Sequence, residues 1–166
     1  MRFKRYITIL GIDPGTKKIG YGLIKKEGNS LKYLQSGLID NNNSPKEKQL
    51  LKIEKDLTKI IKKAKPNLVG IEKLYFLKNK KTALDVAQAK GVIMAVLAKS
   101  KIPLIEVSPT QVKLATTGNG KATKKEVAKM VYLTLGLDQN SKKIDDITDA
   151  LAIAITVSNK SKAIDI

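Results

Sequence analysis

The sequence of 166 residues contains no cysteine and no histidine, and no apolar run in it approaches the ~20 residues of a membrane span. The missing cysteines exclude disulfide scaffolds, zinc ribbons and thiol nucleophiles. The missing histidines exclude Ser-His-Asp triads and acid–base catalysis by imidazole. Any hydrolytic chemistry must therefore rely on carboxylates, hydroxyls, lysines and a bound metal ion.

Acidic residues are scarce as well: 15 Asp and Glu stand against 32 Lys and Arg, which gives a formal net charge of +17. A basic excess of this size predicts binding to a polyanion, most often a nucleic acid. A lysine-rich codon usage is the alternative, because arginine occurs only at Arg2 and Arg5. The apolar run at 7–12 is too short for a signal peptide. We expect a cytoplasmic or nucleoid-associated protein that does not insert into a membrane.

The order of apolar segments predicts an α/β fold in one domain over residues 1–159, followed by a flexible tail at 160–166. An antiparallel three-strand meander precedes two parallel strands, which gives a mixed five-stranded sheet flanked by helices. The expected strands cover residues 7–12, 19–25, 31–39, 68–72 and 102–107. The expected helices run from 45 to Pro66, over 82–99, from the capping boxes Ser108–Gln111 and Thr123–Glu126, and over 145–158.

Two local signals add detail. Asp13-Pro14-Gly15-Thr16 predicts a type II turn after the first strand, with glycine at the third position. Ser44-Pro45-Lys46-Glu47 predicts a further capping box, with proline at the first helical position.

The scarce acids fall at informative places. Asp13 and Glu72 each end an apolar strand, and strand ends in an α/β sheet meet at the edge where ligands bind. Asp146 and Asp149 share one face of the last helix, and Asp145 could join them. Each alone could be a turn residue, a helix cap or a solvated acid. Together they predict a cluster whose repulsion divalent magnesium would relieve, with two ions able to hydrolyse a phosphodiester.

Several basic and aromatic residues are candidates for contact with nucleic acid. Lys124 lies at a helix N-terminus, which favours phosphate, whereas Lys113 is either a phosphate contact or a solvated lysine. Tyr75 lies in a loop with Lys78, Lys80 and Lys81, where an aromatic flanked by cations suits stacking on an exposed base. The alternative is that one of the loop aromatics belongs to the core, and we expect this to be Phe76.

Separated motifs in a fixed order resemble the RuvC family of bacterial Holliday junction resolvases, which have a ribonuclease H-like fold. The likeness covers about residues 8–158. Its motifs are Ile-Leu-Gly-Ile-Asp-Pro-Gly-Thr at 9–16, Gly-Tyr-Gly at 20–22, Gly-Ile-Glu at 70–72, Ala-Gln-Ala-Lys-Gly-Val at 87–92, Gln-Val-Lys at 111–113 and Asp-Ile-Thr-Asp-Ala-Leu-Ala-Ile-Ala at 146–154.

The resemblance implies an Mg²⁺-dependent crossover junction endodeoxyribonuclease of recombination and repair, working as a homodimer on four-way junction DNA with the branch-migration proteins RuvA and RuvB. It would nick two opposed strands symmetrically and leave 5′-phosphate and 3′-hydroxyl ends. The acidic tetrad would be Asp13, Glu72, Asp146 and Asp149, binding two Mg²⁺ ions per subunit, with Mn²⁺ as a substitute. Lys113 and Lys124 match basic positions near the scissile phosphate, and Tyr75 matches an aromatic that stacks on unpaired bases.

Three alternatives remain. A YqgF-type nuclease of the same fold would act on RNA, but such chains usually have Tyr in place of Pro14 and lack the Gln88–Gly91 helix motif. A nucleotide-binding lobe of the actin and sugar-kinase type shares the Gly-Ile-Asp-x-Gly-Thr loop but needs a second lobe. A non-catalytic DNA-binding module would not need the four acids. For a homodimer, the helix over 82–99 is our candidate interface.

Overall fold

A five-stranded mixed sheet forms the centre of the computed structural model, which describes residues 6–15, 17–41, 45–74, 80–138 and 145–160. The strand order is β3-β2-β1-β4-β5. β1 (Tyr6–Asp13), β2 (Lys18–Glu27) and β3 (Ser30–Asp40) form the antiparallel meander, whereas β4 (Leu68–Glu72) and β5 (Leu104–Val107) pair in parallel on the other side of β1. This architecture confirms the expected mixed sheet.

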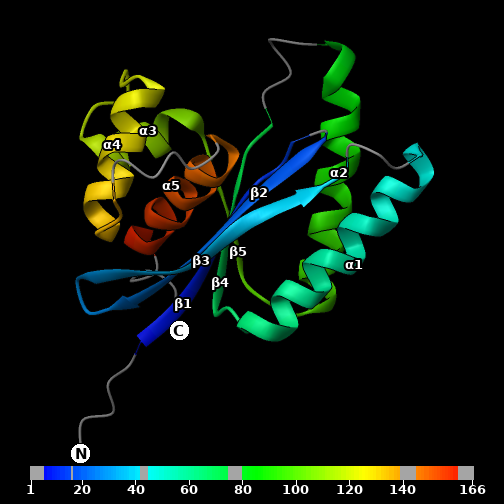
Figure 1. Cartoon of the computed structure of the whole chain (residues 1–166), viewed down its shortest axis with the longest axis horizontal. Coiled ribbons are helices and arrows are strands. Elements are labelled where there is room, and N and C mark those ends of the chain that lie inside the picture. Colours follow the sequence, from blue (N-terminus) through cyan, green and yellow to red (C-terminus); the bar gives the residue numbers. More distant parts are fainter. Residues whose placement is uncertain (1–5, 16, 42–44, 75–79, 139–144, 161–166) are drawn as a thin grey trace, which may run out of the picture.

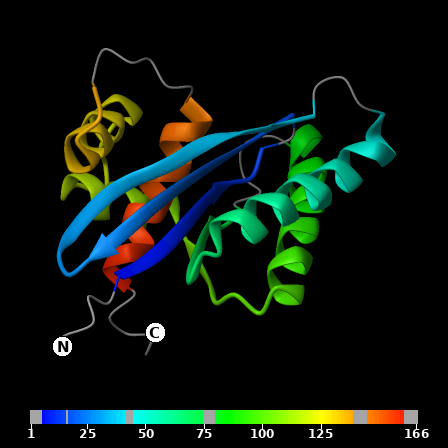
Figure 2. The same ribbon diagram turned by 60° about the horizontal axis from the view of Figure 1, so that its bottom comes forward.

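Helices cover both faces of the sheet (Figure 1). One face carries α1 (Lys46–Ala64) and α2 (Lys80–Lys99). The other carries α5 (Asp145–Lys160), with α3 (Pro109–Thr117) and α4 (Lys124–Leu135) beside it. The same two groups of helices remain on opposite sides of the sheet in the turned view (Figure 2). Each face has its own hydrophobic cluster, so the fold has three layers.

Helix α5 is buried almost all round, because it lies between the sheet and the α3–α4 pair. All its residues from Ala150 to Ser158 are buried. A helix with apolar residues on every side belongs in such a central layer. Its polar start, Asp145–Asp149, emerges at the edge of the sheet where β1 and β4 end.

Most element boundaries agree with the sequence within two residues. The last strand is shorter than expected, starting at Leu104, after a proline that has no amide hydrogen for the sheet. Helix α5 runs through Lys160, and residues 161–166 of the expected tail lie outside the described residues.

The three expected capping boxes had different outcomes. Those at Ser108 and Thr123 are confirmed. The one at Ser44 is wrong: the N-cap of α1 is Pro45, which has no side-chain acceptor, and Ser44 itself lies outside the described residues. Lys48 and Gln49 donate instead to the carbonyl oxygen of Pro45.

The expected type II turn after β1 is also wrong. Such a turn needs a positive φ at Gly15, and Gly15 has none. A side chain there would lie 2.1 Å from the backbone oxygen of Lys18, so the glycine is required by space. Among the described residues, no helix is long and apolar enough to cross a membrane.

Candidate active site

Asp13 and Glu72 end two neighbouring parallel strands. Ile12 of β1 pairs with Ile71 of β4, so the next residue of each strand carries a carboxylate. Successive side chains of a strand point to opposite faces. Because Ile12 and Ile71 both pack in the cluster beneath α1 and α2, both carboxylates belong to the face on which α5 lies.

Helix α5 supplies the other two acids from its first turns. Asp146 and Asp149 are three residues apart and therefore share a face. A methyl group at Gly20 of β2 would lie 1.9 Å from the backbone oxygen of Asp146, and one at Gly11 of β1 would lie 2.0 Å from that of Ala150. Only glycine permits this approach, which brings the start of α5 next to the end of β1.

The four carboxylates face one cleft of about 470 Å³. Strand ends from β1 and β4 form one part of its lining, and α3, α4 and α5 form the rest. Both candidate catalytic lysines also line it. The lining residues are Asp13, Glu72, Pro109, Val112, Lys113, Lys124, Val127, Asp146 and Asp149. The structure thus brings together all six residues expected to be catalytic, while their roles stay predictions.

The other candidates are not part of this cleft as described. Tyr75 and Lys78 lie outside the described residues, and of Lys80 and Lys81 only the backbone, at the start of α2, is described. Asp145 is exposed at the start of α5 and does not line the cleft. The stacking and phosphate roles expected for the lysine-rich loop therefore stay predictions.

Electrostatic repulsion is concentrated at Asp13. Burial, followed by the negative charges of Asp149, Glu72 and Asp146, raises the pKa of its carboxyl group from 3.8 to about 7. The positive charge of Lys124 opposes them. Near neutral pH the Asp13 carboxyl is therefore about half protonated, because burial and the neighbouring carboxylates both disfavour its negative charge.

Lys124 supplies positive charge at the cleft. Its Nζ donates a hydrogen bond to the carboxylate of Asp149 at 3.1 Å, which raises the pKa of the Lys124 ammonium. Its position follows from the capping box that starts α4: the Thr123 hydroxyl accepts from the amide of Glu126, and the Glu126 carboxylate accepts from the amide of Thr123 at 2.6 Å. The Lys124 side chain is 76% exposed, so it can also meet a phosphate from solvent.

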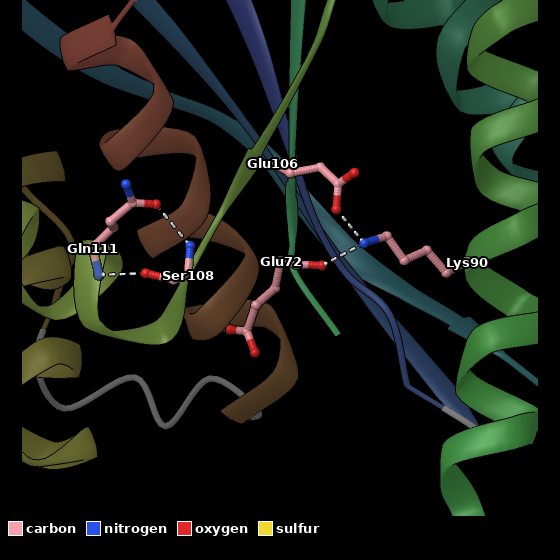
Figure 3. Close-up of polar contacts among 5 residues, drawn as sticks. All are labelled: Glu72, Lys90, Glu106, Ser108 and Gln111. Atoms are coloured by element: carbon pink, nitrogen blue, oxygen red, sulfur yellow. Dashed lines mark hydrogen bonds and ion pairs between the residues drawn. The ribbon is translucent and has the colours of Figure 1, made fainter. Parts of the chain in front are cut away.

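Lys113 projects from α3, which a second capping box fixes. The Ser108 hydroxyl accepts from the amide of Gln111 at 3.1 Å, and the Gln111 side chain accepts from the amide of Ser108 at 2.9 Å (Figure 3). Lys113 follows half-buried in the next turn. Two ammonium groups from separate helices thus line the same cleft as the acids.

The carboxylates do not form a finished coordination sphere. Among the described residues, no group of three or more acidic side chains lies close enough to hold a metal ion as the side chains stand. The donor set nevertheless suits a hard divalent cation, because it consists only of carboxylate oxygens. A bound cation would also relieve the repulsion that raises the pKa of Asp13. The residues present therefore fit a magnesium-type metal.

One contact of this site was missed from the sequence. The buried ammonium of Lys90 on α2 donates to the backbone oxygen of Glu72 at 3.2 Å and to the carboxylate of Glu106 on β5 (Figure 3). Burial and the negative charge of Asp149 raise the pKa of the Glu72 carboxyl, and the positive charges of Lys124 and Lys90 partly oppose this. The available signal was a single lysine between the buried Ala89 and Ile93 of an alanine-rich helix.

The chain is similar in sequence to proteins of one known family. The sequence model of the family described as "Crossover junction endodeoxyribonuclease RuvC" matches residues 9–157. The protein of that name from Prochlorococcus marinus (strain MIT 9312) is 45% identical over 153 residues, which are 92% of this chain and 96% of that protein.

Two solved structures share the architecture. Thermus thermophilus RuvC superposes with a TM-score of 0.85 at 27% identity. The T. thermophilus RuvC complex with a Holliday junction substrate gives 0.88 at 28% identity, and each match covers 95% of this chain and 96% of the other. With the sequence match over nearly its whole length, the chain belongs to the RuvC family of crossover junction endodeoxyribonucleases.

Proposed function

We propose that this chain resolves four-way DNA junctions by nicking two opposed strands symmetrically, in a reaction that depends on Mg²⁺ and leaves 5′-phosphate and 3′-hydroxyl ends. RuvC membership makes it a divalent-metal-dependent nuclease. The observation that carries the finer proposal is the meeting of Asp13, Glu72, Asp146 and Asp149 in one cleft. A junction complex is known for the T. thermophilus relative.

The four carboxylates are the proposed ligands of two Mg²⁺ ions, with Mn²⁺ able to replace them. Two such ions about 4 Å apart supply an activated water and stabilise the leaving oxygen of a phosphodiester. The raised pKa of Asp13 means that this carboxyl must lose its proton to become a ligand. Metal binding should therefore release protons near neutral pH.

The basic residues of the cleft position the DNA backbone in this proposal. Lys113 and Lys124 line the same cleft as the acids, so a phosphate brought to the carboxylates would lie between positive charges. Tyr75 is the proposed stacking residue for an unpaired base, with Lys78, Lys80 and Lys81 as backbone contacts.

Action on a two-fold junction calls for two clefts, and we propose that α2 forms a homodimer interface. Leu84 is 64% exposed and Met94 is 39% exposed on this helix, and Gly91, Ala95 and Ala98 are exposed as well. These residues recur at helical spacing and share one face. Apolar and small side chains on a continuous face favour close helix packing about a two-fold axis. RuvA and RuvB are the proposed partners on the same junction. We propose that this chain acts in the cytoplasm and that its residues 1–159 form a single nuclease domain.

The test offers the purified full chain a synthetic four-way junction, a duplex, single-stranded DNA and structured RNA, each with and without Mg²⁺. Paired nicks at opposed positions are expected on the junction alone, and only with the metal. RNA cleavage would favour the YqgF-type alternative, and junction binding without nicking would favour the non-catalytic module.

The matched variant is Asp13→Asn, which should abolish nicking while leaving junction binding intact. Asp56→Asn serves as control, because Asp56 pairs with Lys52 on α1, on the far face of the sheet. It should nick as the wild type does. Unimpaired nicking by Asp13→Asn would exclude the proposed site.

A further inference from the structure

Lys90 is a buried cation that the proposed chemistry does not use. It lies on α2 with 7% of its surface exposed. Helix α2 packs on the face of the sheet opposite α5, whose first turns line the acidic cleft (Figure 1). Lysine is almost never buried to this extent unless it is paired. Its partner is the Glu106 carboxylate on β5, and the ammonium has a second acceptor in the backbone oxygen of Glu72.

The second contact holds the end of β4, where the sheet stops supporting the chain. Glu72 is the last residue of that strand. On the neighbouring side, the amide of Lys73 donates to the backbone oxygen of Val107 at 2.8 Å, which ties the chain to β5. Lys90 adds a tie to α2, so the peptide between Glu72 and Lys73 is held from two directions.

Holding this peptide also orients the carboxylate. The backbone oxygen of Glu72 faces Lys90, whereas the side chain of Glu72 points away from Lys90 toward α5 (Figure 3). A fixed peptide plane limits the direction of the Cα–Cβ bond, and hence the region that the carboxylate can reach. Groups that orient metal ligands in this way typically change metal affinity or activity by about 10–100-fold when removed.

We propose that Lys90 is a positioning residue for the nuclease reaction: by joining the backbone oxygen of Glu72 to Glu106 and α2, it holds the Glu72 carboxylate in place to bind metal. This inference rests on the proposed function, since it takes Glu72 as a metal ligand. Lys90 touches neither DNA nor metal in this role, and it acts from the opposite face of the sheet.

The test compares Lys90→Met with Lys90→Arg and with a control on the same helix, Lys99→Met. Lys99 pairs with Glu54 at 3.0 Å, and its side chain is 73% exposed. Lys90→Met should raise the Mg²⁺ concentration for half-maximal nicking and lower kcat, together by about 10-fold or more. Junction affinity and KM should stay within about 2-fold of wild type, because positive charge at the DNA surface is unchanged. Lys90→Arg should restore part of the loss, and Lys99→Met should behave as wild type.

Loss of folding must be separated from loss of positioning. Lys90→Met alone leaves Glu106 without its partner, so the double variant Lys90→Met/Glu106→Leu is included. The Lys90 end of this ion pair is buried and the Glu106 side chain is 35% exposed, and apolar replacement of a largely buried ion pair often preserves stability. The double variant should melt near the wild-type temperature and still show the weakened Mg²⁺ dependence.

A second readout measures metal binding without catalysis: the rise in melting temperature of the DNA-free protein as Mn²⁺ is added. The Mn²⁺ concentration that gives half of the maximal rise in melting temperature should be about 10-fold higher in the double variant than in wild type. Wild-type nicking and metal binding in a folded double variant would overturn the role of Lys90, even if Glu72→Gln is inactive. A wild-type protein that fails to nick any junction would instead defeat the proposed function.

Discussion

Replacing Asp13 with asparagine should stabilise the metal-free protein while it destroys the proposed active site. In the folded chain, burial and the charges of Asp149, Glu72 and Asp146 raise the pKa of the Asp13 carboxyl from 3.8 to about 7. The unfolded chain places that carboxyl in water, where it ionises at its usual value. Between pH 4 and pH 7 the folded state therefore binds a proton that the unfolded state has lost, and stability must fall as the pH rises through this range.

The size of the effect follows from the shift. A difference of about 3 pKa units corresponds to about 4 kcal/mol at 1.36 kcal/mol per unit, all of it lost above pH 7. Asparagine removes this cost but brings an amide that needs hydrogen bonds, at about 1–2 kcal/mol. The expected net gain at pH 8 is about 2–3 kcal/mol, or roughly 5–10 °C in Tm.

Thermal unfolding of both proteins in EDTA at pH 4, 6 and 8 measures this directly. At pH 4 the variant should melt slightly below wild type, because the wild-type carboxyl is already protonated there and only the amide cost of about 1–2 kcal/mol remains. The Tm of Asp13→Asn should rise relative to wild type with increasing pH and exceed it at pH 8, and Mg²⁺ should raise the Tm of wild type but not that of the variant. Asp56→Asn should show no gain, because the Asp56 carboxylate is 2.6 Å from Lys52. A variant that melts at or below wild type at pH 8, or a gain independent of pH, would refute the clustering of charge around Asp13.

Two further substitutions test how the cleft is built. Gly20→Ala places a methyl group 1.9 Å from the backbone oxygen of Asp146; the displacement of about 1 Å needed to relieve this should lower nicking about 100-fold, whereas Gly37→Ala meets only the movable side chain of a tyrosine and should leave nicking unchanged. Lys124→Met removes the exposed ion pair with Asp149, so the free energy of unfolding should fall by less than about 1 kcal/mol. The rate of junction nicking should fall by much more than this small loss of stability explains. A nicking rate that falls only as far as the folded fraction does would make Lys124 merely structural.

The acidic cluster could be predicted because local patterns carry it. Strand alternation and the pairing of β1 with β4 require only an apolar run that ends in an acid, and both Asp13 and Glu72 satisfy this. The spacing of Asp146 and Asp149 is likewise a property of one helix. What had to be supplied from outside was that these segments meet, and there the family motifs contributed more than periodicity did.

The features that sequence reasoning got wrong or missed depend on distant contacts. Gly15 matched a turn pattern, but its requirement comes from the backbone of Lys18. The role of Lys90 depends on contacts with β4 and β5, whose residues Glu72 and Glu106 lie 18 and 16 residues away along the chain. A lysine in an alanine-rich helix gives no indication of its acceptors, because burial is decided by the packing of α2 on the sheet.

The contact of α5 with the sheet has a consequence for redesign. At Gly11 and Gly20 the helix rests on strand backbone, with no layer of side chains between them that could be repacked. The distance between α5 and the strands that carry the acids should therefore be fixed, because no substitution of intervening side chains can change it. Attempts to change substrate preference would do better on the part of the cleft lined by α3 and α4, where side chains and not strand backbone form the lining.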